Sequence, residues 1–143
     1  MTNREYIERI FPKLRGTDWE IISPKNPKYN CVAWSLCETN NWWEPDPMGE
    51  YYWPPGLPRG DYSVKAYQTM FESLGYRDCK DEDFGTEYEN IAIFADQGRF
   101  KHVCRQKESG VWTSKLGRDE DIDHPLEAVG GNVYGNPTTF LIK

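Results

Sequence analysis

The sequence predicts a single α+β domain spanning residues 1–143, because helical patterns occupy its first half and strand patterns its second half. A chain of 143 residues accommodates one hydrophobic core and leaves little room for a second. Aromatic residues make up 15% of the chain, with six Trp and nine Tyr. This apolar content is typical of a folded protein and argues against disorder.

Three helices are expected in the first half of the chain. Apolar residues recur at spacings of three and four over residues 3–14, although Pro12 weakens the second part of this helix. A second helix, with the apolar run CVAWSLC, begins at or just after Asn30, which is a favourable cap. The third helix covers residues 61–74 and ends at Gly75.

Strand patterns dominate the second half. Short apolar runs separated by turn signals predict strands at residues 18–23, 91–95, 100–105, 111–116 and 138–142. Three of these strands follow one another closely and form an antiparallel meander, with His102 on its middle strand. The segment 117–137 is rich in turn residues.

A long loop is predicted at residues 40–58, which contain five prolines, two glycines and five aromatic residues. Its tryptophans Trp42, Trp43 and Trp53 offer aromatic faces that suit a substrate groove. The same side chains can instead form a small core within the loop, and we expect that packing role for most of them.

Charge and cysteine content restrict the partners and the compartment. The formal net charge of −6 disfavours nucleic acids and anionic membranes. We expect a cytoplasmic protein with reduced thiols, because no apolar run suits a signal peptide or a membrane span. The four cysteines lie 6, 42 and 25 residues apart, unlike the short paired spacings of zinc sites. Neither a metal nor a cofactor is therefore expected, and the sequence does not indicate an oligomeric state.

A cysteine and a histidine form the candidate chemical centre. At the start of a helix, Cys31 would meet unpaired N–H groups that lower the pKa of its thiol and make it a better nucleophile. On a neighbouring strand, His102 would accept the thiol proton and later return it to the leaving group. The third residue, which would orient the imidazole, is Ser114, with Thr113 and Lys115 as its competitors.

These residues lie in segments that resemble a known peptidase family. The motif Y-N-C-V-A at residues 29–33 resembles the Y-D-C-S-G nucleophile segment of NlpC-type cell-wall peptidases, within the papain-like superfamily. His102 resembles the histidine of their second motif, and their third polar residue, about a dozen positions later, corresponds to Ser114. The resemblance implies a papain-like fold, with N-terminal helices and the nucleophile at a helix N-terminus beside an antiparallel sheet. Ser114 differs from the His, Asn, Asp or Gln usual at that position.

The whole chain also resembles a group of uncharacterised bacterial proteins. Their shared pattern is Y-N-C-x-A-W, W-W, Y-W-P-P-G, F-x-x-L-G-Y, a histidine followed by a basic-glutamine pair, W-T-S-K-L-G, D-I-x-H and Y-G. This resemblance implies no activity.

The hypothesis that follows is a thiol hydrolase or amidase that cleaves a peptide, isopeptide or glutamine side-chain amide through a thioester on Cys31. A peptide or protein substrate would be held by residues near the nucleophile. The backbone at Asn30 or the N–H of Cys31 would form the oxyanion site. The predicted substrate-binding residues are Asn30, Trp42, Trp43, Trp53 and Lys115.

Other interpretations assign these residues structural roles. Cys31 can be a packed core thiol, and His124 can be bonded to neighbouring carboxylates or serve as a substitute base. Lys115 and Arg105 can bind a substrate carboxylate or pair with the surplus acids. The alternative functions are a catalytically inactive binding or regulatory module that uses the loop 40–58, and a zinc-stabilised structural domain.

Overall fold

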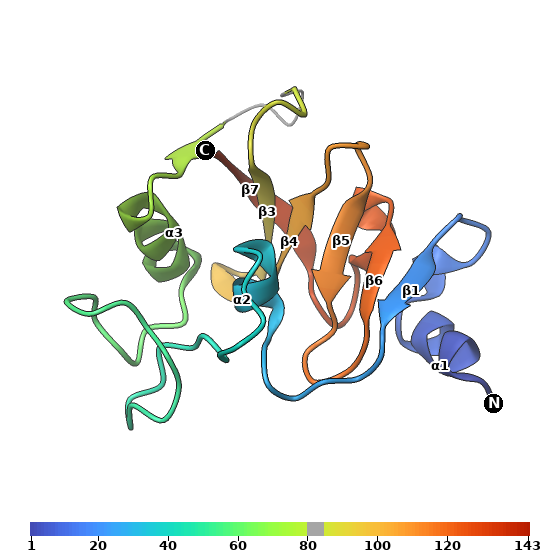
Figure 1. Cartoon of the computed structure of the whole chain (residues 1–143), viewed down its shortest axis with the longest axis horizontal. Helices are drawn as coiled ribbons and strands as arrows, with labels where there is room; N and C mark the ends of the chain where they lie inside the picture. The colour runs from blue at the N-terminus through green and yellow to red at the C-terminus, as the bar shows by residue number, and fades with distance from the viewer. Residues whose placement is uncertain (80–84) are drawn as a thin grey trace.

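The centre of the molecule is a twisted seven-stranded sheet, seen in a computed structural model that describes residues 1–79 and 85–143. Across the sheet the order is β1-β6-β5-β4-β3-β7-β2, and every neighbouring pair is antiparallel (Figure 1). The strands are β1 (Glu20–Ser23), β2 (Arg77–Asp78), β3 (Asn90–Asp96), β4 (Arg99–Gln106), β5 (Trp112–Lys115), β6 (Asp121–His124) and β7 (Asn136–Ile142).

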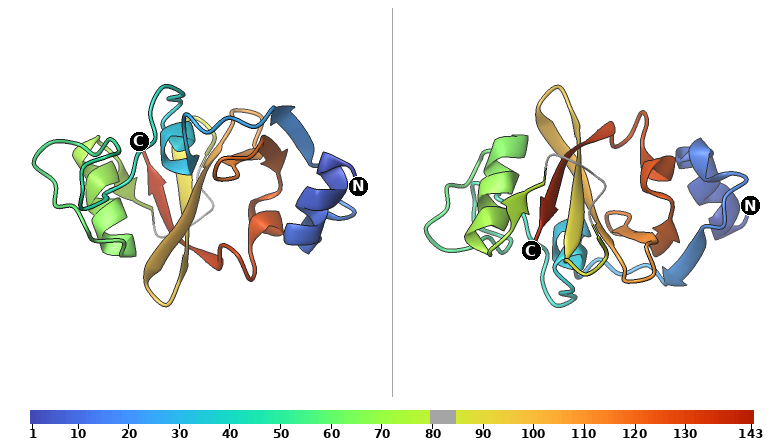
Figure 2. Two further views of the ribbon diagram at one scale, coloured as in Figure 1. Left: turned by 90° about the horizontal axis from the view of Figure 1, so that it is seen from below. Right: turned by 90° about the horizontal axis from the view of Figure 1, so that it is seen from above.

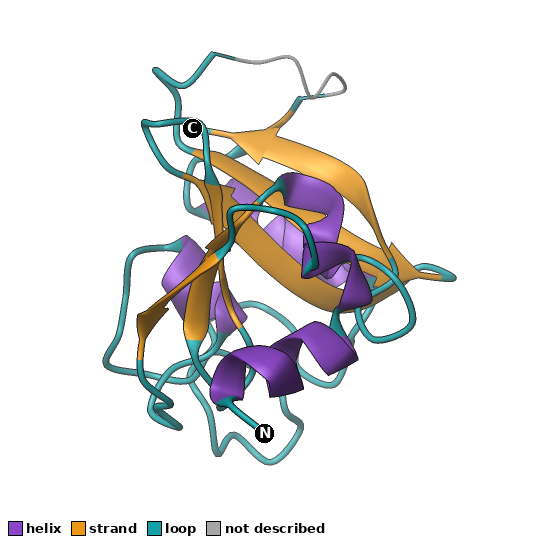
Figure 3. Ribbon diagram, turned by 90° about the vertical axis from the view of Figure 1, so that its right-hand side faces the viewer, coloured by secondary structure: helices purple, strands orange, loops and turns teal. Residues whose placement is uncertain are grey.

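Short helices surround this sheet. Figure 2 shows α1 and α3 at opposite ends of the molecule with α2 between them, and Figure 3 shows how short the helices are beside the strands. The helices are α1 (Asn3–Ile10), α2 (Cys31–Ser35) and α3 (Val64–Ser73), with 3-10 turns η1 (Pro12–Leu14) and η2 (Leu126–Val129). In the described residues, no helix is long and apolar enough to cross a membrane.

The predicted papain-like α+β fold is wrong, because the structure is mostly one antiparallel sheet with a few short helices. The helix that begins at Cys31 has only five residues. The segment 117–137, predicted as turns, supplies β6, η2 and the start of β7. Its D-I-D-H run alternates between the two faces of the sheet, which is the pattern of a strand despite the polar composition.

Several local predictions are confirmed by the structure. Asn30 caps α2, and its side chain accepts a hydrogen bond from the backbone N–H of Ala33. The first helix ends before Pro12, as expected from the effect of proline on the preceding residue. The third helix begins after the cap Ser63. Strands β3 and β4 form the predicted hairpin, and β5 follows them in the sheet.

Two hydrophobic cores lie on the two faces of the sheet. Side chains alternate along β3, so Ala92 and Phe94 face one core, whereas Ile91 and Ile93 face the other. We call the first the α1-side core, because α1 contributes Ile7 to it. The second, the α3-side core, contains Tyr67, Met70 and Phe71 of α3, together with Val32, Trp53, Tyr76, Ile91, Ile93, Val103 and Leu141.

Strands β4 and β5 pair over a short length and then separate. Their ladder consists of Arg105 opposite Thr113 and Gln106 opposite Trp112. In the same register, Val103 would face Lys115, but that pair is not formed. Helix α2 packs against both strands. The N-terminus of α2, with Cys31, therefore lies over the region where the two strands part.

The loop 40–58 is held together largely by contacts of its own. The rings of Trp43 and Tyr52 pack with centroids 4.5 Å apart. The carboxylate of Asp46 accepts hydrogen bonds from two loop N–H groups and from Arg59, whose Nη1 lies 3.0 Å away. Trp53 is buried and packs edge-on against Tyr67 of α3. This loop is consequently an ordered part of the protein.

Candidate active site at Cys31 and His102

The start of α2 is fixed by Asn30. Its Oδ1 accepts from the N–H of Ala33 at 3.3 Å and from the N–H of Trp43 at 3.1 Å, while its Nδ2 donates to the carbonyl of Trp43 at 2.7 Å. The Asn30 side chain therefore ties the helix start to the loop 40–58. These bonds set the position of Cys31, the first residue of α2, which is half-buried.

The segment before Cys31 is anchored to strands β5 and β6. The hydroxyl of Tyr29 donates to Oδ2 of Asp121 at 2.7 Å. The ammonium of Lys115 lies over the ring of Tyr29, 4.8 Å from its centroid, and donates to the carbonyls of Asn26 and Gly117 at 2.8 and 2.6 Å. Because Lys115 is fully buried and bonded in this way, the structure places it as a support for the loop rather than facing a substrate.

The environment of the Cys31 sulfur contains opposing effects. Burial raises the pKa of the thiol to about 11, since a thiolate is poorly solvated there. The backbone N–H groups of Val103, Val32 and Cys31 itself are directed at the sulfur and act in the opposite direction. Contrary to the expected lowering at a helix start, desolvation dominates, because α2 is short and its first turn is packed against the sheet. At pH 7 the Cys31 side chain is thus a protonated thiol.

The imidazole of His102 is buried between two aromatic rings. Tyr134 stacks on it with centroids 4.0 Å apart and planes 2° from parallel, and Phe94 meets it edge-on at 5.6 Å. Its Nε2 lies 2.8 Å from the hydroxyl of Ser114. Its Nδ1 is buried and has no hydrogen-bond partner among the described residues. Burial, and then the charge of His124, lower the pKa of His102 well below its usual value, so the ring is neutral at pH 7.

A third polar residue extends this arrangement to β6. The hydroxyl of Ser114 lies 2.7 Å from Nε2 of His124, and Nδ1 of His124 lies 2.7 Å from the carbonyl of Pro125. Ser114 and His124 are diagonal neighbours on one face of the β5–β6 ladder. Both side chains are fully buried, and burial lowers the pKa of His124 to about 4.

The structure brings His102 and Ser114 into direct contact. The Cys31 thiol instead interacts with the backbone of the next residue on the strand of His102. The N–H directed at the sulfur belongs to Val103, the residue that follows His102. The Cys31 side chain packs against the α3-side core, and the His102 ring contacts Phe94 of the α1-side core. Both residues lie where β4 and β5 separate, and no hydrogen bond joins them within the described residues.

The predicted tryptophans differ in their surroundings. Trp53 is buried in the α3-side core, so it does not line an open groove. Trp42 is partly exposed and bonds to Glu44 through Nε1 at 3.1 Å. Trp43 has the Nε1 atom buried without a partner among the described residues, and its backbone bonds to Asn30.

Two further residues contact the His102–Ser114 pair: His124, which the sequence offered as a substitute base, and Tyr134, for which the sequence suggested no role. His124 was expected to bond to carboxylates, but it contacts Ser114 and a backbone carbonyl instead. Tyr134 stacks on His102. The motifs D-I-x-H and Y-G contain these two residues and were the available signal. Gly135 lies beside Tyr134 with φ of +72°, and a side chain there would overlap the backbone carbonyl of Ala95.

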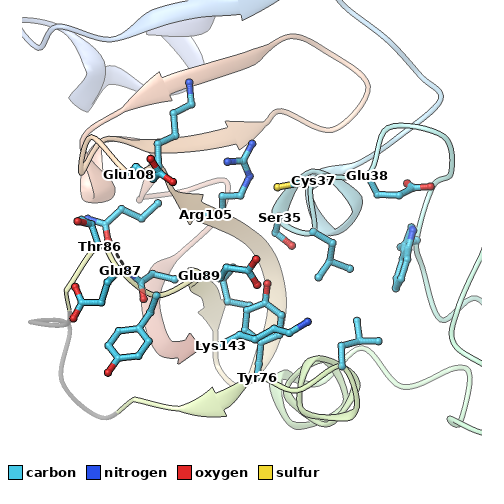
Figure 4. A pocket seen from close by; sticks show the side chains of 18 residues that line it. Ser35, Cys37, Glu38, Tyr76, Thr86, Glu87, Glu89, Arg105, Glu108 and Lys143 are labelled. Carbon is cyan, nitrogen blue, oxygen red and sulfur yellow. Dashed lines mark hydrogen bonds between the residues drawn. The ribbon is translucent and has the colours of Figure 1, made fainter.

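A separate cavity of about 600 Å³ lies at the other end of α2. Figure 4 shows Cys37 and Arg105 on one of its sides and Glu89, Tyr76 and Lys143 on another. Neither Cys31 nor His102 lines it. Cys31 and His102 lie away from this cavity, on the adjacent elements α2 and β4.

The structure also bears on metal binding and on the cysteines. Within residues 1–79 and 85–143, no group of three His, Cys, Asp or Glu side chains is arranged to hold a metal ion. All four cysteines are free thiols. Cys37 is the exposed one, with φ of +59° at the end of α2.

Comparison with known proteins gives one match. A family model described as "Domain of unknown function (DUF7689)" matches residues 20–142, which is most of the chain. No curated protein and no solved structure matches it. The matched region contains the sheet, α2 and every residue of the candidate site.

Proposed function

The chain belongs to the DUF7689 family, and we propose that it is a thiol-dependent hydrolase that cleaves an amide bond through a thioester on Cys31. The supporting observation is Nδ1 of His102, a ring nitrogen that is buried, neutral and without a hydrogen-bond partner in the described part of the chain. Buried polar atoms are nearly always hydrogen bonded, and leaving one unpaired costs about 1–3 kcal/mol. Such a nitrogen, on the strand that packs against the helix of Cys31, suits a general base that is kept available for a proton.

The proposed reaction uses this nitrogen twice. His102 Nδ1 takes the proton of the Cys31 thiol while the sulfur attacks the amide carbonyl carbon and forms the carbon–sulfur bond. When the tetrahedral intermediate collapses, the carbon–nitrogen bond breaks, and the leaving amine takes the proton from His102. A water molecule then gives a proton to His102 and attacks the thioester. The carbon–sulfur bond breaks, the acid leaves, and the proton returns to Cys31.

The opposing effects of burial and hydrogen bonding on the pKa of the Cys31 thiol fit this order of reaction steps. A thiol with a pKa raised to about 11 stays protonated until a base takes the proton, so its chemistry would depend on His102. The N–H groups of Val103 and Cys31 lower the pKa of the thiol by hydrogen bonding, and in the proposed reaction they would also donate to the oxyanion of the attacked carbonyl. The resemblance of residues 29–33 to a peptidase nucleophile segment gives further support.

The substrate remains a class rather than a compound. Peptide, isopeptide and glutamine side-chain amides all suit the mechanism, and the net charge of −6 favours a neutral or cationic peptide or protein over nucleic acid. The free thiols fit a reducing compartment such as the cytoplasm.

An activated ester tests the nucleophile without knowledge of the natural substrate. The exposed competitor is first removed by Cys37→Ser, and the protein is then mixed with p-nitrophenyl acetate. We expect a burst of p-nitrophenolate, followed by slower turnover, and one acetyl group located on Cys31 by peptide mass spectrometry. Cys31→Ala abolishes the burst, and His102→Gln slows it by at least about tenfold, since general base catalysis contributes about 10²–10⁴-fold.

The control is Lys101→Gln, a substitution of an exposed residue on the same strand, which should leave the burst unchanged. Acetylation at other residues, or an equal burst in His102→Gln, would contradict the proposal. The alternative, a binding or regulatory module that uses the loop 40–58, would then become the leading hypothesis.

A further inference from the structure

The hydrogen-bond chain behind His102 has a single consistent direction, which is set at its far end. The carbonyl of Pro125 can only accept, so Nδ1 of His124, 2.7 Å away, must carry a hydrogen. Burial lowers the pKa of His124 to about 4, so its ring is neutral at pH 7 and carries only that one hydrogen. Nε2 of His124 is consequently a bare acceptor.

This acceptor determines how the Ser114 hydroxyl is used. The hydroxyl has one hydrogen, and its oxygen lies 2.7 Å from Nε2 of His124 and 2.8 Å from Nε2 of His102. Because His124 can only accept, Ser114 donates to it. The sulfur of Cys104 is also within reach of the hydroxyl, but a thiol is a weak acceptor beside an imidazole nitrogen. The Ser114 oxygen is then left to accept a hydrogen bond from His102.

The tautomer of His102 follows directly. Its Nε2 carries the hydrogen that is donated to Ser114, and the neutral ring has no second hydrogen. Nδ1 is therefore a bare lone pair, in agreement with its lack of a partner among the described residues. The two histidines of the chain would be neutral and in opposite tautomers, His102 with Nε2–H and His124 with Nδ1–H.

The geometry points to His124 as a positioning residue that, through Ser114, holds His102 in the tautomer whose Nδ1 can accept a proton. This role rests on the proposed function of His102 as a base. Without an acceptor at residue 124, the Ser114 hydroxyl is free to donate to Nε2 of His102 instead. That reversal would move the ring hydrogen to Nδ1, where it blocks the transfer of a proton from Cys31.

Nuclear magnetic resonance of protein labelled with ¹⁵N in its histidines tests the inference without any substrate. The chain has only two histidines, so each substitution at residue 124 leaves one imidazole and the assignment is direct. At pH 7 we expect opposite tautomers in the wild type. His124→Phe should move His102 wholly or largely to the Nδ1–H form. His124→Gln, which keeps an acceptor at the end of its side chain, should preserve the Nε2–H form.

The p-nitrophenyl acetate burst provides the second readout. His124→Phe should slow it by at least about tenfold, since a wrong imidazole tautomer in a catalytic triad costs up to about 10⁴-fold. His124→Gln should restore most of the rate. His102 in the Nδ1–H form in the wild type overturns the inference, and so does an unchanged tautomer in folded His124→Phe.

The wild-type spectrum is sufficient for the first of these tests if His124→Phe fails to fold. Opposite tautomers with no acetylation of Cys31 would retain tautomer control by His124 and reject the hydrolase. Acetylation that depends on His102, together with the Nδ1–H form of His102 in the wild type, would retain the hydrolase and reject tautomer control by His124.

Discussion

Mild acid should destabilise this protein through its buried neutral histidines. His124 has a pKa of about 4 in the folded state and about 6.5 when unfolded. Between these values the unfolded chain binds a proton that the folded chain excludes. The stabilisation from His124 is therefore complete above pH 6.5 and is lost as the pH falls towards 4. At about 1.4 kcal/mol for each unit of pKa difference, it amounts to about 3 kcal/mol, of which about 2 is lost between pH 7 and pH 5. The lowered pKa of His102 acts in the same direction.

Urea unfolding at pH 7 and pH 5 measures this effect for the wild type and for His124→Gln. The quantity compared is the loss of unfolding free energy between the two pH values, so any cost of the substitution at pH 7 cancels. The wild type should lose about 2 kcal/mol more than the variant, because Gln does not titrate. Equal losses in the two proteins would show that His124 is not a buried neutral group.

Three further substitutions test the supports of the site. Gly135→Ala should lower the unfolding free energy by at least about 2 kcal/mol, because the new methyl group would overlap the carbonyl of Ala95. Thermal unfolding followed by circular dichroism measures this loss, and a midpoint within 1 °C of the wild type would contradict the described turn. Asn30→Ala should lower the unfolding free energy by about 1–2 kcal/mol, because the helix cap is lost. It should also slow acetylation of Cys31, since the hydrogen bonds to Trp43 are lost as well. An unchanged acetylation rate would show that this cap does not position the thiol. Lys115→Met keeps a long side chain but leaves two carbonyl groups without their donor. We therefore expect the free energy of unfolding in urea to fall by about 1–3 kcal/mol. A more stable variant would mean that burying the ammonium destabilises the protein by more than its hydrogen bonds stabilise it.

Local features of the chain were predictable because they depend on neighbouring residues. The cap at Asn30 and the helix end before Pro12 follow from side-chain and backbone chemistry within one turn. The β3–β4 hairpin follows from two apolar runs joined by a short turn. Strand β6 was missed because Asp121–His124 is mostly polar, and its pairing with β1 and β5 joins segments that are distant in the sequence.

The chemistry of the site depends on burial, which sequence patterns do not report. A helix start predicted a lowered pKa for Cys31, whereas packing against the sheet raises it. The resemblance to NlpC-type peptidases had suggested that Ser114 would orient His102, and the two side chains are in contact. The contact of His124 with Ser114 depends instead on the register of β5 and β6. The stacking of Tyr134 on His102 likewise joins distant segments, so the sequence around either residue does not predict this contact.

Activation of the Cys31 thiol by His102 can be measured from the rate at which this thiol is alkylated. Folded protein carrying Cys37→Ser would be treated with iodoacetamide at pH 7, with and without His102→Gln, and the modification of Cys31 followed by peptide mass spectrometry. We expect that removing the imidazole slows alkylation of Cys31 by at least about tenfold, because a thiol of raised pKa then lacks its base. Equal rates in the two folded proteins would contradict it and would make Cys31 a packing residue.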